Sequence, residues 1–155
     1  MPETKNILED LGQRDMTLLY GQRYWSLALL RIFLGIVFAY HGALRLLVPA
    51  NLSGSISYFT QVGIPHASFA VYLFGIIELA GGLLLFFGLL TRWSAFIVLL
   101  EMIYVFFKVH LKNGILVGSN GYEFALVLIA GLVVILASGA GKIALVKFFK
   151  SRHLK

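Results

Sequence analysis

Four apolar blocks alternate with polar or turn-forming segments along the chain. They cover about residues 25–48, 68–90, 93–111 and 122–140, and each has about 19–24 residues. An α-helix rises 1.5 Å per residue, so each block is long enough to cross a hydrocarbon core of roughly 30 Å. Leucine and alanine dominate, and the ten-residue alternation of a membrane β-strand does not occur. The pattern predicts an all-α integral membrane protein, a four-helix bundle.

The breaks between these blocks carry residues that end or begin helices. Pro49 ends the first block, the segment 63–65 (Gly-Ile-Pro) precedes the second, and the segment 88–92 forms a tight link in which Thr91 can cap the third helix. The segment 139–141 (Gly-Ala-Gly) suits the end of the fourth helix. Residues 49–67 contain no Lys or Arg, and they predict either a short helix in the membrane interface or an ordinary loop.

Two polar ends flank the membrane domain, which covers residues 25–141. Residues 1–24 form an N-terminal cytoplasmic or interfacial segment, in which Asn6 and Glu9 have the spacing of a capping box and predict a short interfacial helix. Residues 142–155 mix basic and apolar positions. We expect this amphipathic tail to continue the fourth helix onto an anionic membrane surface, or to act only as a basic anchor.

Lys and Arg are unevenly distributed between the flanks of the four blocks. Nine lie in the N-terminal segment, the second link and the C-terminal tail, whereas two lie in the first and third links. Because basic residues are retained on the cytoplasmic side, both termini are predicted to be cytoplasmic.

Composition supports the membrane assignment and excludes some other classes. Hydrophobic residues make up 59% of the chain and charged residues 13%, against about 25% charged in a typical soluble domain. The net charge is +6, but 12 of the 20 charged residues lie in the two ends rather than in a stripe, so nucleic acid is not an expected partner. The chain has no cysteine, which excludes thiolate nucleophiles, iron–sulfur clusters and covalently attached haem.

Seven ionisable residues lie in or next to the apolar blocks. Each costs roughly 2.5–3.5 kcal/mol to insert at the centre of a membrane helix, so each needs a partner or a function. With the predicted orientation, Arg31 can snorkel to the cytoplasmic surface. The other six residues converge on the middle and outer half of the membrane. The seven residues are Arg31, His41, Arg45, Glu78, Glu101, His110 and Glu123.

Spacing within this set predicts a cluster. His41 and Arg45 are four residues apart and therefore share a helix face, which we expect to meet Glu78 on the second helix. The small residues Gly81 and Gly82 let a neighbouring helix approach closely. Such a cluster either carries chemistry or only fixes helix packing. No obvious cation shares the depth of Glu101, whose role is open.

Other ionisable residues have simpler interpretations. Glu123 is either part of the cluster or an N-terminal helix charge favoured by the helix dipole, and His110 is either part of it or a polar end residue. Two histidines on different helices, His41 and His110, are a weak signal for b-type haem. The sequence contains no haem, metal or flavin motif.

The ordered set of motifs resembles the DoxX family. The run from Leu30 to Arg45 resembles the family's opening signature, an Arg-led apolar run ending in His-Gly-x-x-Lys, although Arg45 stands in place of the Lys. The segments 59–65, 78–82, 88–92, 121–123 and 139–141, together with His110, follow in the family's order. The resemblance covers about residues 27–146. It marks Arg31, His41, Arg45, Glu78, Arg92 and Glu123 as motif positions, whereas Glu101 is outside the pattern.

The resemblance implies a multi-pass protein of a prokaryotic plasma membrane. Relatives include small subunits linked to quinone-dependent sulfur oxidation and members of membrane oxidoreductase complexes that manage oxidative or thiol stress. We therefore expect partners among other oxidoreductase subunits as well as the lipid bilayer. A homo-oligomer is compatible with the sequence.

Three hypotheses of function follow. In the first, the chain is a subunit of a quinone-linked oxidoreductase rather than a complete enzyme, with His41, Arg45 and Glu78 as the catalytic cluster. Candidate residues of the quinone slot are Tyr40, Glu101, Tyr104, His110 and Glu123. In the second, the chain is a non-catalytic anchor or assembly subunit. In the third, it transports a proton or a small solute.

Overall fold

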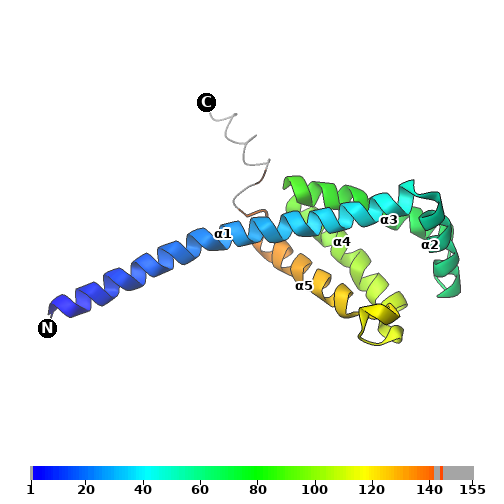
Figure 1. The fold of residues 1–155 in the computed structure, drawn as a ribbon. Coiled ribbons are helices and arrows are strands. Elements are labelled where there is room, and N and C mark those ends of the chain that lie inside the picture. The colour runs from blue at the N-terminus through cyan, green and yellow to red at the C-terminus, as the bar shows by residue number, and fades with distance from the viewer. Residues whose placement is uncertain (1, 142–143, 145–155) are drawn as a thin grey trace, which may run out of the picture.

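The computed structural model describes residues 2–141 and 144, with side chains from residue 24 onward. The chain is all-α within this part. Its helices are α1 (Pro2–Leu47), α2 (Pro49–Gln61), α3 (Ala67–Phe87), α4 (Thr91–Val105) and α5 (Glu123–Ser138) (Figure 1). A π-helical turn, η1 (Phe106–His110), and a 3-10 turn, η2 (Leu111–Asn113), continue α4, and a second 3-10 turn, η3 (Val117–Ser119), precedes α5. The tail predicted over residues 142–155 lies outside the described residues.

Three segments have the length and composition of membrane spans. They are Tyr24–Leu47, Ala67–Phe87 and Thr91–Asn113. The fourth apolar helix, α5, has 16 residues and is shorter than the predicted block 122–140. At 1.5 Å per residue it extends about 24 Å, less than the roughly 30 Å hydrocarbon core. The structure thus gives three full-length spans and a shorter apolar helix.

The structure decides several boundaries that the sequence left open or misplaced. The segment that begins at Pro49 is a helix, α2, rather than a loop, and Val48 separates it from α1. The N-terminal segment is not a separate short helix, because α1 runs without a break from Pro2. Thr91 is not a cap, since α4 begins at Thr91 after Leu90 and has no side-chain capping bond. Gly139 ends α5 with a positive φ of 85°, as predicted.

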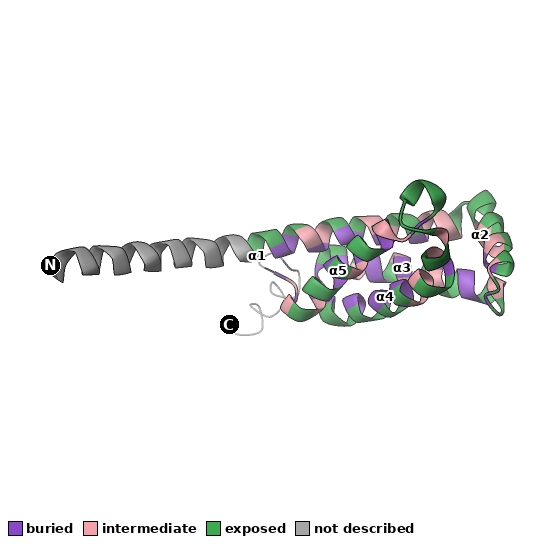
Figure 2. Cartoon of the chain, turned by 90° about the horizontal axis from the view of Figure 1, so that it is seen from below, coloured by how far each residue is buried: buried purple, intermediate pink, exposed green. Residues whose placement is uncertain are grey.

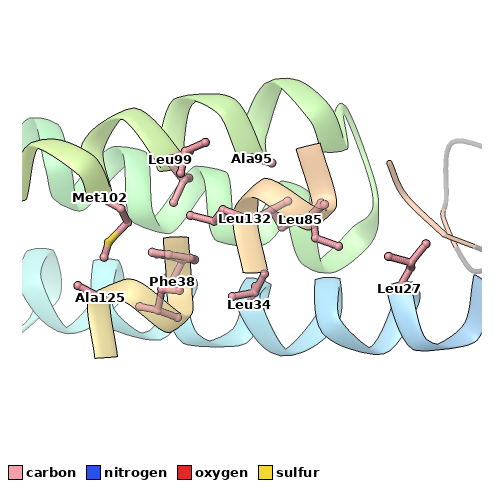
Figure 3. Packing of buried hydrophobic residues seen from close by; sticks show 12 residues of the cluster. Leu27, Leu34, Phe38, Leu85, Ala95, Leu99, Met102, Ala125 and Leu132 are labelled. Atoms are coloured by element: carbon pink, nitrogen blue, oxygen red, sulfur yellow. The ribbon is translucent and has the colours of Figure 1, made fainter. Parts of the chain in front are cut away.

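The main core lies between α1, α3, α4 and α5. Buried residues recur at intervals of three, four or seven, as in Leu27, Leu34 and Phe38 of α1 (Figure 3). On α5, Ala125, Leu128, Leu132 and Ile135 form the matching stripe. Large apolar side chains on the opposite faces are exposed, so buried positions lie inside the bundle and exposed ones around it (Figure 2). A helix that is apolar on all sides is typical of a membrane protein.

Helices α1 and α3 form the closest pair, and glycines make their approach possible. Gly35 lies against the backbone of residues 82–86, and Gly42 lies against that of residues 75–79, so the two helices are antiparallel. Gly82 in turn meets the backbone of Ala39, whereas Gly81 faces Val98 of α4. The prediction that these small residues admit a neighbouring helix is confirmed.

Helix α2 covers one end of the bundle, called here the α2 end (Figure 1). Phe59 is buried there, and its ring packs edge-on against Phe74 with centroids 5.8 Å apart. Phe74 makes a similar contact, at 5.7 Å, with Tyr104. This second apolar cluster fixes α2 beside the last turn of α1, which carries Arg45.

Candidate functional site

An ion pair joins α1 to α3 near the α2 end. Arg45 Nη2 lies 3.2 Å from Glu78 Oε1, which confirms the predicted pairing of these two residues. The contact is possible because Gly42, three residues before Arg45, brings α1 against the backbone of Gly75 and Leu79. The guanidinium also lies 5.7 Å from the ring centroid of Phe59, within the range of a cation–π contact.

Glu101 on α4 adds a second carboxyl to this ion pair. Its ionisable neighbours are Glu78 and Arg45, and only 4% of the residue is exposed. The prediction that no obvious cation shares its depth was wrong, because Arg45, which pairs with Glu78, also interacts electrostatically with Glu101. Neither carboxylate oxygen of Glu101 has a hydrogen bond of standard geometry to the described residues. Glu78 Oε2 and Arg45 Nη1 are likewise buried without such a bond.

Two adjoining cavities open around this cluster. The α2 cavity has a volume of about 460 Å³ and lies between α2, the end of α1 and η1. The bundle cavity has a volume of about 270 Å³ and lies between α1, α3, α4 and α5. The residues that line both are His41, Arg45, Val105, His110 and Asn120.

The bundle cavity combines polar and apolar walls. Glu78 lines it together with the shared residues His41, Arg45 and His110. Its remaining walls are mostly apolar and include Val37, Phe38, Met102, Phe124 and Leu128. A mostly apolar cavity with a few convergent polar groups is typical of a site for a small molecule.

His41 and His110 lie at the meeting point of the two cavities. His41 is exposed and Arg45 is half-buried, which differs from the buried cluster that the spacing predicted. His110 Nδ1 lies 2.9 Å from the carbonyl oxygen of Asn120 and donates to it, since that oxygen can only accept. Asn120 Nδ2 donates to the Tyr58 hydroxyl at 2.7 Å and so ties the loop before α5 to α2.

Three other candidate residues lie away from the cavities. Tyr40 is 60% exposed and lines neither cavity, although its ring meets the His41 ring edge-on at 6.0 Å. Tyr104 belongs to the apolar cluster beneath α2. Glu123 Oε1 accepts a hydrogen bond of 2.6 Å from the Val117 backbone and closes the loop before α5. The structure therefore brings Glu101 and His110, but not these three, to the ion pair.

The two motif arginines Arg31 and Arg92 hold helix ends at the opposite end of the bundle. Arg31 Nη1 donates to the carbonyl oxygens of Leu85 and Phe86 at the end of α3, at 2.5 and 2.9 Å. Arg31 is 1% exposed, so the prediction that it snorkels to the membrane surface was wrong. Arg92 Nη2 donates to Ala137 near the end of α5 at 3.2 Å. A cation is favourable at a helix C-terminus.

The polar face that α2 presents to the α2 cavity was not predicted from the sequence. Asn51, Ser55 and Tyr58 line this cavity. They are four and three residues apart, which places them on one face of a helix. The sequence therefore indicates this polar face as soon as residues 49–61 are assigned as helical. Among the described residues, no group of three or more His, Asp or Glu side chains forms a metal site.

Comparison with known proteins identifies the family. The family model described as DoxX matches residues 26–111, from α1 to the end of the third span. No solved structure matches significantly.

Two relatives cover most of this chain. A Haemophilus influenzae protein, named only as uncharacterized, is 38% identical over 133 residues, which is 83% of this chain and 94% of the relative. A Mycobacterium tuberculosis protein, named uncharacterized membrane protein Rv3486, is 31% identical over 81% of this chain and 82% of its own length.

A third relative carries a name that suggests an activity. A Bacillus subtilis protein named "Putative oxidoreductase CatD" is 36% identical over 64% of this chain and 70% of its own length. The family match and the spans lead to one conclusion. The chain belongs to the DoxX family and is a multi-pass membrane protein.

Proposed function

We propose that the protein is a membrane subunit of a quinone-linked oxidoreductase and that the bundle cavity takes the quinone headgroup. The observation that carries this proposal is the lining of that cavity, which joins the Arg45–Glu78 ion pair to an apolar wall. A quinone has the same division, with polar carbonyls on the ring and an apolar tail. The name of the Bacillus subtilis relative supports an oxidoreductase.

The residues of the bundle cavity fit a quinone headgroup. Arg45 Nη1 is buried without a hydrogen bond and can donate to a ring carbonyl. His41 and Glu78, which line the cavity with it, are groups that can hold and release protons. Phe38, Met102 and Leu128 provide the apolar wall.

Each polar residue has a distinct part in this proposal. A bound quinone supplies the capacity to accept two electrons and two protons. Arg45 orients a carbonyl and holds Glu78 in place at 3.2 Å. Glu78 and His41 carry protons, and the exposed His41 exchanges them with water that enters the α2 cavity. The electrons come from a redox partner protein, since an electron carrier built on cysteine cannot form in this chain.

Binding of short-tailed ubiquinone and menaquinone analogues to the purified protein tests the proposal. We expect His41→Ala to weaken binding about tenfold, equivalent to about 1.4 kcal/mol. His66→Asn is the matched control, because His66 lines neither cavity and its left-handed backbone (φ 52°) tolerates asparagine. Absence of binding, or equal weakening by both variants, contradicts the proposal.

The ion pair itself favours a second candidate function, that of a non-catalytic anchor or assembly subunit. Arg45 and Glu78 join α1 to α3, and such a pair can serve packing alone. If this is its role, Glu78→Gln lowers the unfolding temperature and the activity of the assembled complex in the same proportion. Loss of activity at unchanged stability excludes the anchor function.

A further inference from the structure

Glu101 is a buried carboxyl that the proposed quinone site does not itself use. It lines neither cavity, whereas its neighbour Glu78 lines the bundle cavity. Glu78 Oε1 contacts Arg45, but its other oxygen is buried without a hydrogen bond of standard geometry. Gly81 of α3 lies against Val98 of α4. Because a short turn joins these two antiparallel helices, Glu78 and Glu101, each one turn further along the same face, are neighbours.

The cluster has one fixed cation for two carboxyls. If both were ionised, Arg45, Glu78 and Glu101 would together carry a net charge of −1 at a place where Glu78 and Glu101 are 6% and 4% exposed. Burying an uncompensated charge costs several kcal/mol, so a proton on one carboxyl is favoured.

No other described fixed cation compensates the second carboxylate. Arg31 and Arg92 bond to helix ends away from the α2 end, and Lys108 and Lys112 are exposed. The sequence of α2 contains no charged residue, and the single charged residue of α5, Glu123, bonds to the loop. The remaining titratable groups that line the two cavities are His41 on α1, Tyr58 on α2 and His110 on η1.

We propose that Glu78 and Glu101 form a carboxyl pair that holds a single proton, with the proton on Glu101 and the negative charge on Glu78 beside Arg45. The function of this pair as a proton donor rests on the proposed quinone site. The proton passes from Glu101 to Oε2 of Glu78 and from there to an acceptor in the bundle cavity. Both carboxyls are then ionised until a proton from water restores the pair.

Infrared spectroscopy of the purified, quinone-free protein at neutral pH measures this proton directly. A protonated carboxyl has a C=O band that is separate from the carboxylate bands and shifts in D₂O. We expect one such band in the unchanged protein. Glu101→Gln and Glu78→Gln should each abolish it, since a single carboxyl beside Arg45 is ionised. Arg45→Gln should raise its intensity about twofold, because neither carboxyl then has a cation.

Glu123→Gln is the matched control and should leave the band unchanged, because Glu123 lies in the loop contact with Val117. Thermal unfolding checks that each variant is folded, and the two nearly isosteric Glu→Gln variants decide the proposal even if Arg45→Gln does not fold. Absence of the band in the unchanged protein, as expected if a metal cation neutralises both carboxylates, contradicts the shared proton. A band that survives Glu78→Gln also contradicts it. Neither result affects quinone binding, which is measured separately.

Discussion

At the scale of single residues, the arginines of this chain have two different tasks. Arg31 and Arg92 donate to backbone carbonyls at the ends of α3 and α5, whereas Arg45 pairs with a carboxylate. Position in the sequence shows only that a cation lies at a certain depth. Which acceptor it meets depends on the helix that the fold brings beside it.

The buried position of Arg31 predicts a large effect on stability. Arg31→Met removes two charge-assisted hydrogen bonds, to Leu85 and Phe86, each contributing about 1.5–3 kcal/mol. We expect the free energy of unfolding to fall by about 3 kcal/mol or more, measured by thermal unfolding in detergent.

Arg92→Met provides the comparison for this prediction. Arg92 is exposed and donates one bond, to Ala137, so its loss should cost about 1 kcal/mol. Equal losses in the two variants would show that burial of Arg31 does not determine its contribution.

At the scale of helices, close packing of α1 on α3 positions the ion pair. The sequence predicted that Gly81 and Gly82 admit a neighbour, but it did not show that they face different helices. Adjacent residues on a helix point about 100° apart, so only the arrangement of three helices assigns Gly82 to α1 and Gly81 to α4. Gly35 and Gly42 complete the contact from the α1 side.

Gly42→Ala should therefore disrupt the α1–α3 contact. A Cβ atom there would overlap the backbone of Leu79 and Gly75, which cannot move without separating the helices. We expect a loss of about 1–3 kcal/mol, and a lower yield of monodisperse protein.

The same substitution in α2 is the control. A Cβ atom at Gly54 has nothing within 4 Å, and alanine favours helix more than glycine does. Gly54→Ala should leave stability unchanged or raise it by up to about 1 kcal/mol. A Gly42→Ala variant as stable as Gly54→Ala would refute the proposed role of the glycine contact.

At the scale of the whole molecule, the sequence predicted four spanning helices, and the structure gives three of them the full length of a span. The sequence also predicted the Arg45–Glu78 pair. These features follow from hydrophobic length and helical spacing. The position of Glu101 beside them did not follow, because it depends on how α4 packs against α3. The two cavities were also beyond the sequence, since α2 and the loop that carries Asn120 form them jointly.

The predicted topology places both termini in the cytoplasm and α2 outside, and single cysteines can test it because the chain has none. A cysteine at Ser53, which is exposed on α2, should react with a membrane-impermeant maleimide in intact cells. A cysteine at Thr4 should react only after permeabilisation. The reverse pattern would overturn the predicted orientation.

Photocrosslinking with an azidoquinone in native membranes, followed by peptide mapping, tests the proposed quinone site most directly. We predict that the labelled peptides contain bundle-cavity residues such as Phe38, Met102 and Phe124. A separate apolar groove of about 230 Å³ between α3 and α4, lined by Ile76, Leu84 and Trp93, provides an internal comparison. Labelling confined to that groove, or no labelling above the lipid background, would contradict the account.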